Sequence, residues 1–321
     1  MNTLTRLLPR LALAAAVLAV APHAMSQAFP SRPIAIVVPV AAGCGADALA
    51  RMIAIPLAER LGQPVVVENR PGAGSNIGNA QVAKARPDGH TLLVMLPPIA
   101  YANAFWDNLS YKTTDITPVI NMVSYPYVLT AHPAFPPNDL SELVAYAKKN
   151  PDKVRVATAG SSVQMTMLLF REKAGISMLE VPYKGTGDAR PALLSGTVDL
   201  AIEVPAVPPP LVEAGRMKVL GVSGKSRLAL YPKAQAMNEV APDLQIQSWI
   251  GLGAPAGTPR EIVERLNREV ATILKAPEMA SKMRNMYYDL ELGSPESFAA
   301  LIRSEGDAYG RIIQKYQLKP N

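Results

Sequence analysis

The feature that most constrains the fold of this chain is a repeated alternation between short runs of β-branched residues and segments of helical periodicity. Ile34–Val38 has the composition of a buried strand, and residues 48–61 have the pattern of a helix. Strands at 65–68 and 91–95 and a helix at 75–85 continue the alternation. Because strands separated by helices favour parallel pairing through right-handed crossovers, the sequence predicts an α/β fold.

The same alternation resumes in the middle of the chain and changes character near the C-terminus. The later elements are predicted as helices at 140–149 and 164–174, strands at 154–157, 198–202 and 218–222, and a short segment at 211–214. A strand at 249–254 precedes two helices, 259–274 with Thr258 as its expected N-cap and 295–309 with Ser294 in the same role. No low-complexity linker divides the chain, which predicts two α/β lobes connected by more than one passage of the chain.

The N-terminus has the three parts of a secretory signal peptide. Arg6 and Arg10 give a basic start, residues 11–21 form an apolar run, and small residues follow as far as Ala28. The apolar run is about half of the ~20 residues that a membrane-spanning helix needs. We therefore expect residues 1–28 to be removed on export and the remaining chain to be periplasmic.

Composition excludes several classes of protein. A chain with 49% hydrophobic and 18% charged residues is typical of a globular protein rather than a disordered one. The net charge of +6 comes from basic residues that are scattered rather than clustered, so no nucleic-acid interface is predicted. Cys44 is the only cysteine, which excludes an internal disulfide and leaves stability to the hydrophobic core.

Two strand-to-helix turns have the composition of anion sites. Gly43, Cys44 and Gly45 follow the first strand, and a second turn at 158–162 follows the strand at 154–157. Small residues allow the backbone to approach a ligand closely, and a helix start offers unpaired N–H groups and the positive end of the helix dipole. Two such turns, one in each lobe and facing each other, would suit a negatively charged ligand.

A third strand–turn–helix unit, at 181–189, brings Tyr183 and Lys184 within reach of a ligand from the second lobe. Two roles fit Asn76, which either caps a helix or donates to a carboxylate. Two roles also fit Glu203, an acid in an apolar setting: an internal ion pair, or a contact with a hydroxyl or amine of the ligand.

Two nucleotide-binding motifs are imitated but incomplete. Gly43 and Gly45 after a strand resemble a dinucleotide fingerprint, but residues 39–42 intervene where the fingerprint turns at once. Residues 221–226 imitate a P-loop, but Val219 stands where that motif needs a glycine. No cofactor is therefore predicted.

Catalysis is not predicted either. Beyond the signal segment the chain has only His90 and His132, both expected in surface turns. No G-x-S-x-G nucleophile elbow is present, and no cluster of His, Cys, Asp or Glu has metal-ligand spacing. The sequence therefore gives no motif of a serine or cysteine hydrolase or of a metalloenzyme, and we do not expect the protein to be an enzyme.

A series of short motifs spans the chain after the signal segment. They are Phe-Pro-Ser-Arg-Pro-Ile at 29–34, Pro-Val-Ala-Ala-Gly at 39–43, Glu-Asn-Arg-Pro-Gly-Ala-Gly at 68–74, Asn-Ile-Gly at 76–78, Pro-Asp-Gly at 87–89, Val-Pro-Tyr-Lys-Gly at 181–185, Ala-Gly at 214–215, Trp249, and Ala-Pro-Ala-Gly-Thr-Pro at 254–259. In this order they resemble the Bug receptors, the substrate-binding proteins of tripartite tricarboxylate transporters.

The resemblance implies a type II periplasmic binding protein, with two α/β lobes and a ligand cleft at the hinge. Lobe 1 is expected at 29–123 plus 248–321 and lobe 2 at 124–247. The implied ligand is a small dicarboxylate or aromatic carboxylate, held largely by backbone groups and by residues of the segment 97–101. The expected ligand-binding residues, from the turns and the resemblance together, are Val40, Ala41, Ala42, Gly43, Cys44, Gly45, Asp47, Asn76, Pro98, Ile99, Gly160, Ser161, Ser162, Gln164, Tyr183, Gly185 and Glu203.

Three segments depart from the family pattern. Cys44 stands where a third glycine is usual, and residues 164–170 lack the His and Glu of the family and carry methionines instead. The loop expected at 97–99 reads Pro-Pro-Ile, apolar where Ser or Thr is common. We therefore expect a less polar second-lobe surface and a ligand whose far end is aromatic or bulky.

The implied partners are the membrane permease subunits of a transporter, and the protein is expected to act as a monomer without a cofactor. Two alternatives stay open. One is a sensory binding protein that signals to a membrane partner, such as a sensor kinase, without transport. The other is an exported hydrolase.

Overall fold

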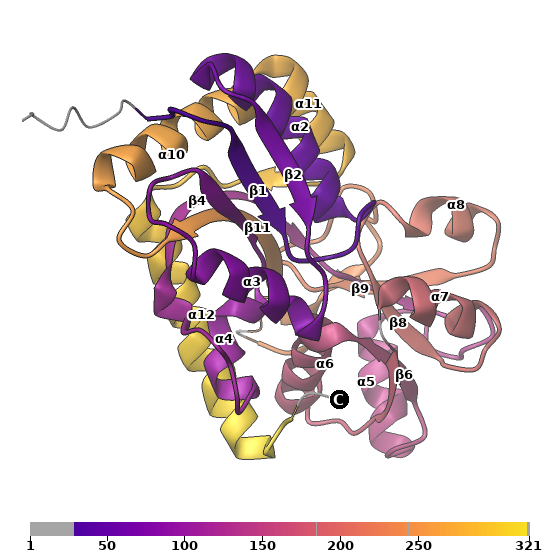
Figure 1. The fold of residues 1–321 in the computed structure, drawn as a ribbon. Helices are drawn as coiled ribbons and strands as arrows, with labels where there is room; N and C mark the ends of the chain where they lie inside the picture. Colours follow the sequence, from indigo (N-terminus) through magenta and orange to yellow (C-terminus); the bar gives the residue numbers. More distant parts are fainter. Residues whose placement is uncertain (1–28, 184, 243, 245, 320–321) are drawn as a thin grey trace, which may run out of the picture.

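In the computed structural model, the chain forms two mixed sheets, each flanked by helices (Figure 1). The structure describes residues 29–183, 185–242, 244 and 246–319. The predicted signal peptide at 1–28 and Lys184 lie outside the described residues. We use lobe 1 for the described residues of 29–126 and 247–319 and lobe 2 for those of 127–246. The predicted α/β class with two lobes is confirmed.

The first sheet is built around the earliest strands of the chain. Its spatial order is β12 (Asp289–Leu290), β4 (Ile116–Pro126), β11 (Gln247–Pro255), β3 (Thr91–Met95), β1 (Ile34–Val38) and β2 (Val65–Asn69). β1 pairs in parallel with β2 and β3, as predicted, but β11 runs antiparallel between β3 and β4. The reason is that β11 enters the sheet at the end where β4 leaves it, so parallel pairing is excluded at this position.

The second sheet repeats this arrangement. Its spatial order is β10 (Gln235–Ala236), β9 (Lys218–Val222), β5 (Val128–Ala131), β8 (Leu200–Glu203), β6 (Arg155–Ala159) and β7 (Leu179–Tyr183). β6 pairs in parallel with β7 and β8, whereas β5 is antiparallel to both of its neighbours. In each sheet, the first strand after the chain enters from the other lobe, β11 or β5, runs antiparallel to both of its neighbours.

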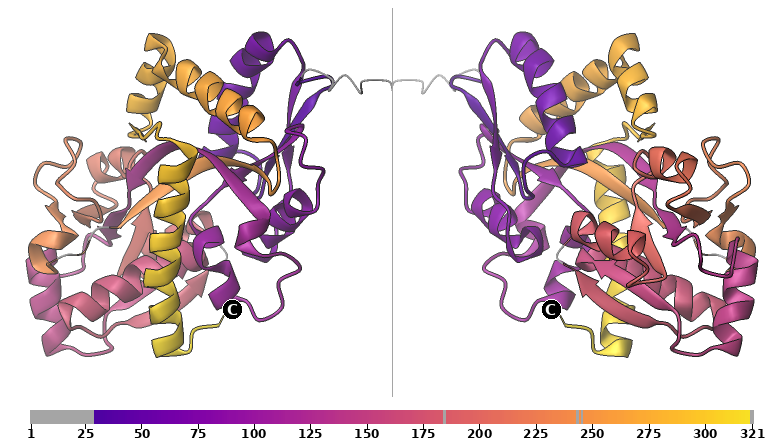
Figure 2. Two further views of the ribbon diagram at one scale, coloured as in Figure 1. Left: turned by 90° about the vertical axis from the view of Figure 1, so that its left-hand side faces the viewer. Right: turned by 90° about the vertical axis from the view of Figure 1, so that its right-hand side faces the viewer.

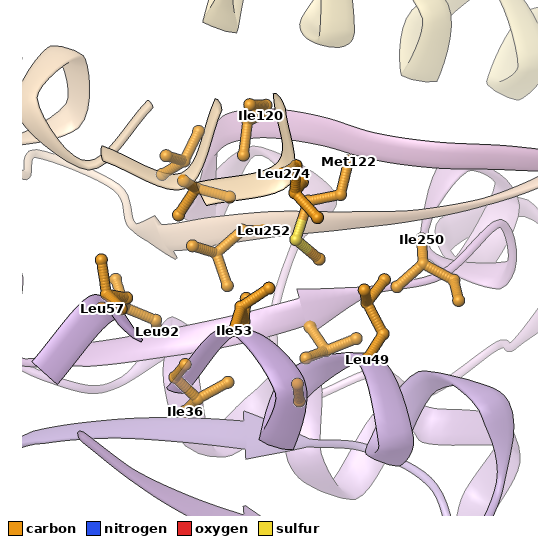
Figure 3. Close-up of a cluster of buried hydrophobic side chains, with 14 of the residues drawn as sticks. Ile36, Leu49, Ile53, Leu57, Leu92, Ile120, Met122, Ile250, Leu252 and Leu274 are labelled. Atoms are coloured by element: carbon orange, nitrogen blue, oxygen red, sulfur yellow. The ribbon is translucent and has the colours of Figure 1, made fainter. Parts of the chain in front are cut away.

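Helices cover both faces of each sheet, as strands that are apolar on both faces require. The helices of lobe 1 are α2 (Gly45–Leu61), α3 (Asn76–Ala83), α4 (Pro98–Phe105), α10 (Arg260–Lys275), α11 (Pro277–Asn285) and α12 (Pro295–Tyr316). Ile36 of β1 packs with Leu49 and Ile53 of α2 on one face of the first sheet (Figure 3). Val37 points to the other face and packs with Phe298 of α12. Successive side chains of β1 therefore point to opposite faces of the sheet and pack in two different hydrophobic cores.

The helices of lobe 2 form around a smaller core. They are α5 (Leu140–Lys149), α6 (Gly160–Ala174), α7 (Thr186–Leu194), α8 (Pro208–Glu213) and α9 (Met237–Val240). Val156 of β6 and Leu200 of β8 pack with Leu143 of α5 and Phe170 of α6. Among the described residues of both lobes, none of the helices has the length and apolar character needed to cross a bilayer.

Two helix ends differ from the sequence prediction. α10 begins at Arg260 with Pro259 in the N-cap position, because the hydroxyl of Thr258 donates to the carbonyl of Pro255 (2.7 Å) instead of capping the helix. Ser294 caps α12 as predicted, and its hydroxyl accepts from a backbone N–H of the first turn at 3.2 Å. α12 nevertheless continues past its predicted end. Figure 2 shows this helix running alongside both lobes.

The chain passes between the lobes at two neighbouring points. It leaves β4 at Pro126 and enters β5 at Val128, and it returns from lobe 2 into β11 at Gln247. Gln247 and Pro126 are partners in the β4–β11 ladder, so the two passages lie side by side. The sequence analysis placed the lobe boundaries close to these passages, at 123/124 and 247/248, although it did not predict the strand β4.

We predict that Gly251→Ala on β11 lowers the free energy of unfolding by about 1–3 kcal/mol. A Cβ at this position would overlap the ring of Phe298 and lie 2.9 Å from the carbonyl oxygen of Ile120, which belongs to the rigid backbone of β4. Urea denaturation measures the loss. The control is Gly187→Ala on α7, where a Cβ meets nothing within 4 Å, and stability should be unchanged or higher. Equal effects of the two substitutions would contradict the packing argument.

Candidate functional site

A cavity of about 440 Å³ lies between the two lobes. Its lining residues are Ala73, Gly74, Phe105 and Trp106 from lobe 1, and Thr158, Gly160, Ser161, Gln164, Pro182 and Tyr183 from lobe 2. This volume falls within the range of ~300–1,000 Å³ that is usual for sites of small ligands. None of these lining residues carries a formal charge, so backbone N–H groups, hydroxyls, the Gln164 amide and the Trp106 indole are the donors that they can offer to an anion.

The first turn of α6 brings an uncapped helix N-terminus to the cavity. β6 ends at Ala159 and α6 begins directly at Gly160, whose φ of +75° favours glycine. The turn expected at 158–162 is therefore the end of a strand and the start of a helix, without a loop between them. No side chain caps this helix, whose first turn contains Gly160, Ser161 and Ser162. Such an N-terminus attracts anions.

The opposite wall of the cavity is aromatic. Phe105 ends α4, Trp106 follows it, and their ring centroids lie 4.7 Å apart with an angle of 87° between the planes. Gly74, in the short helix η2 (Ala73–Ser75), has a φ of +61°, and a Cβ there would lie 2.5 Å from Cζ2 of the indole. The sequence reasoning missed this wall, because no motif covers 105–106. A tryptophan just after an apolar helical segment was the available signal.

Direct contacts hold α6 against lobe 1. The hydroxyl of Tyr101 on α4 donates to Oγ of Ser161 at 3.1 Å. Met165, one turn along α6, is fully buried in a cluster with Tyr101, Phe105 and Ile313 of α12. The prediction that the methionines of 164–170 make the second-lobe surface less polar is wrong, because the side chain of Met165 fills this junction and that of Met167 is buried in the core of lobe 2.

The family of the chain follows from comparison with known proteins. The model of the tripartite tricarboxylate transporter family receptor matches residues 49–318. The chain belongs to this receptor family. The protein of the tcbD–tcbE intergenic region of Pseudomonas sp. (strain P51) is 35% identical over 300 residues, covering 92% of this chain and 89% of the relative. BugT of Bordetella pertussis is 30% identical over 319 residues, covering 97% and 98%. The resemblance to Bug receptors is therefore confirmed.

Solved structures of the family share the fold of this receptor. A protein of R. palustris with adipate has a TM-score of 0.80 at 31% identity, covering 91% of this chain and 100% of its own. MatC from Rhodopseudomonas palustris with bound malate has a TM-score of 0.77 at 33% identity, covering 89% and 100%. The periplasmic binding protein BugD has a TM-score of 0.77 at 32% identity, covering 91% and 100%.

The turn of the receptor before α2 is not among the segments that line the cavity. Its residues are exposed at Ala41, Ala42 and Gly43 and half-buried at Val40, Cys44 and Gly45. The carboxylate of Asp47 accepts from the N–H of Gly43 (2.9 Å) and the amide of Asn69 (3.0 Å). Arg51 donates to it at 3.0 Å and is the largest cause of its lowered pKa. Asp47 thus shapes the turn from within rather than offering its oxygens to a ligand.

Pro98 and Ile99, expected in a loop, form the first turn of α4 in the receptor. Ile99 is 1% exposed and packs in the core with Trp249, so it does not face a ligand. Asn76 is also buried, and its side chain accepts from the hydroxyl of Tyr111 at 2.7 Å and donates to the backbone of η2. The suggested helix-capping role is not observed, because Ser75 is the N-cap of α3 and no side chain caps this helix; Asn76 instead fixes the segment that carries Gly74.

Glu203 is 1% exposed and forms two hydrogen bonds with the guanidinium of Arg190, at 2.8 and 3.0 Å. Of the two roles left open for Glu203, the internal ion pair is therefore the one observed. Gly185 is half-buried in the N-cap position of α7, and Ser162 is half-buried in the first turn of α6. Neither is among the residues that line the cavity, whereas Gly160, Ser161, Gln164 and Tyr183 are brought together there as predicted neighbours.

One carboxylate lies close to the junction of the lobes without a cationic partner among the described residues. Glu305 of α12 accepts from the indole N–H of Trp249 at 2.8 Å. Burial raises its pKa from the usual 4.5 to about 7, and this Trp249 bond is the only opposing influence. The charge of Glu305 contributes to the raised pKa values of the hydroxyls of Tyr101, Tyr127 and Tyr309. The carboxyl of Glu305 therefore titrates near neutral pH.

We predict that Glu305→Gln flattens the pH dependence of stability. Because the folded-state pKa exceeds the unfolded one, the folded protein holds the extra proton between about pH 4.5 and 7, and the free energy of unfolding falls as pH rises through this window. Glutamine keeps an acceptor for Trp249 and removes the cost, raising stability at pH 8 by up to about 3 kcal/mol. Urea denaturation at pH 5 and pH 8 measures the difference. Exposed Glu278→Gln is the control, and equal slopes for parent and Glu305→Gln would contradict the assignment.

Proposed function

We propose that this receptor captures a small organic carboxylate outside the cytoplasmic membrane and delivers it to the permease subunits of a tripartite tricarboxylate transporter. The observation that carries the proposal is the cavity between the lobes, onto which the uncapped N-terminus of α6 opens. Two relatives of similar fold contain carboxylates, adipate in one and malate in the other. Dicarboxylates and aromatic carboxylates are the ligand classes under this proposal.

In this proposal the ligand carboxylate accepts from the amides of Gly160 and Ser161, and Gln164 and Tyr183 contact the rest of the molecule. A helix N-terminus can hold one negative charge without a cationic side chain. The exposed turn at 40–45 joins the site when the lobes rotate about the neighbouring passages at Pro126 and Gln247, a hinge motion of the kind that closes two-lobed binding proteins.

Under this proposal the receptor binds its ligand without catalysing a reaction. His90, expected at the surface, is buried: it accepts from the N–H of Ser31 (3.1 Å), and its other ring nitrogen lies 3.1 Å from Asp88. His132 borders a different surface pocket. Neither histidine lines the cavity between the lobes, and no group of potential metal ligands occurs among the described residues. These placements favour a receptor over the exported hydrolase.

A thermal-shift screen of the purified protein against aliphatic and aromatic mono- and dicarboxylates tests the ligand class. A ligand at a hundredfold excess over its Kd should stabilise the fold by about 2.7 kcal/mol through mass action. We expect at least one carboxylate to raise the melting temperature in a concentration-dependent way. A complete lack of response across the panel would refute the proposal.

Ser161→Asp tests the placement of the carboxylate. An aspartate in the first turn favours the helix dipole and can still accept from Tyr101, so the fold should be retained. Its charge repels an anion bound at the same amides, and we expect the Kd of the screened carboxylate to rise at least about tenfold. Ser297→Asp, in the first turn of α12, adds the same charge away from the cavity and should leave the Kd unchanged. Unaltered binding by Ser161→Asp would place the anion elsewhere.

A further inference from the structure

We infer that the ligand of this receptor is an aromatic carboxylate whose ring lies against Trp106, with its carboxylate at the first turn of α6. This inference rests on the proposed function and narrows its ligand class. It depends on the two unlike walls of the cavity, one rich in N–H donors and the other aromatic.

The lobe 1 wall forms a rigid aromatic corner. The planes of Phe105 and Trp106 are almost perpendicular, at 87°, and Phe105 is anchored in the core at 3% exposure. Gly74 lies so close to the indole that even a methyl group there would displace it. Because Trp106 is fixed between these two neighbours, ligand binding need not order its side chain, which removes one cost of association.

A corner of this shape selects a flat ring. A planar ligand can stack on the partly exposed indole of Trp106 or meet it edge to face, the two arrangements that aromatic pairs prefer, while the buried Phe105 holds the indole in place. A saturated ring or a flexible chain fills the same space but gains neither contact. From lobe 2, Pro182 and Tyr183 add further flat surface to the same cavity.

The polar end of the cavity fixes the orientation of such a ligand. The uncapped first turn of α6, with Gly160 and Ser161, lies on the lobe 2 side, and the indole and phenyl rings lie on the lobe 1 side. A molecule with a carboxylate at one end and an aromatic ring at the other can contact the first turn of α6 and the aromatic side chains at the same time. The assigned aromatic subsite therefore consists of Gly74, Phe105 and Trp106.

Matched ligand pairs isolate the aromatic contribution. Benzoate is compared with cyclohexanecarboxylate, and terephthalate with cyclohexane-1,4-dicarboxylate, by titration calorimetry. Within each pair the carboxylates and the carbon count are the same, so a difference in Kd reports the ring. In the pair that binds more tightly, we expect the aromatic member to bind about three- to tenfold more tightly.

Three variants tie this preference to Trp106. Trp106→Leu should abolish it, whereas Trp106→Phe should retain most of it. Tyr316→Leu removes an exposed aromatic ring of α12 outside the cavity and should leave it unchanged. Trp106 and buried Trp249 are the two tryptophans of the chain, so aromatic ligands should change the tryptophan emission of the parent but not of Trp106→Phe.

The outcomes separate this inference from the proposed function. Equal or tighter binding of the saturated members, or an aromatic preference that survives in Trp106→Leu, overturns the aromatic subsite alone. If none of the four probes binds while another carboxylate of the wider screen does, the subsite is again refuted and the receptor function stands. If no carboxylate binds at all, both fail. If Trp106→Leu does not fold, two measurements still test the aromatic subsite. They are the Kd values of the ligand pairs with the parent protein and the tryptophan emission of Trp106→Phe.

Discussion

The pairing of β4 with β11 is the constraint on which the rest of the molecule depends. Both strands lie inside the first sheet, and both lead directly into the passages between the lobes at Pro126 and Gln247. Because these passages are neighbours in one ladder, the lobes are joined along a single line instead of at two separated points. The cavity walls can therefore move relative to each other without breaking either sheet.

The cavity combines strong directional donors with a lining that carries no formal charge among its described residues. An anion bound to backbone amides receives partial positive charge that is fixed in direction by the helix, and no flexible side chain has to be ordered. Two carboxylates that the sequence analysis expected to contact the ligand are paired within the protein: Asp47 accepts from Arg51, and Glu203 accepts from Arg190. Glu305, at the same junction of the lobes, titrates near pH 7 because burial opposes its charge.

The candidate site could be predicted only in part from the sequence, and the residues whose role was left open share a physical cause. Gly160 and Ser161 were found because a small-residue turn between a strand and a helix has a local signature. Asn76 and Glu203 were ambiguous because the partner of a polar side chain, here Tyr111 and Arg190, comes from a distant segment. Local composition identifies a group that needs a partner, but not whether that partner is the protein or a ligand.

The sequence by itself determined the α/β class, the two lobes and several elements to the residue, among them Ile34–Val38, Leu140–Lys149 and Lys218–Val222. It did so because strand and helix periodicity, caps and turns act over a few neighbouring residues. Only the tertiary structure decided that β5 and β11 are reversed, that the turn at 160 opens into the cavity, and that Trp106 faces it from the other lobe. These features depend on contacts between segments far apart in the chain, whose free energy comes from packing and not from local pattern.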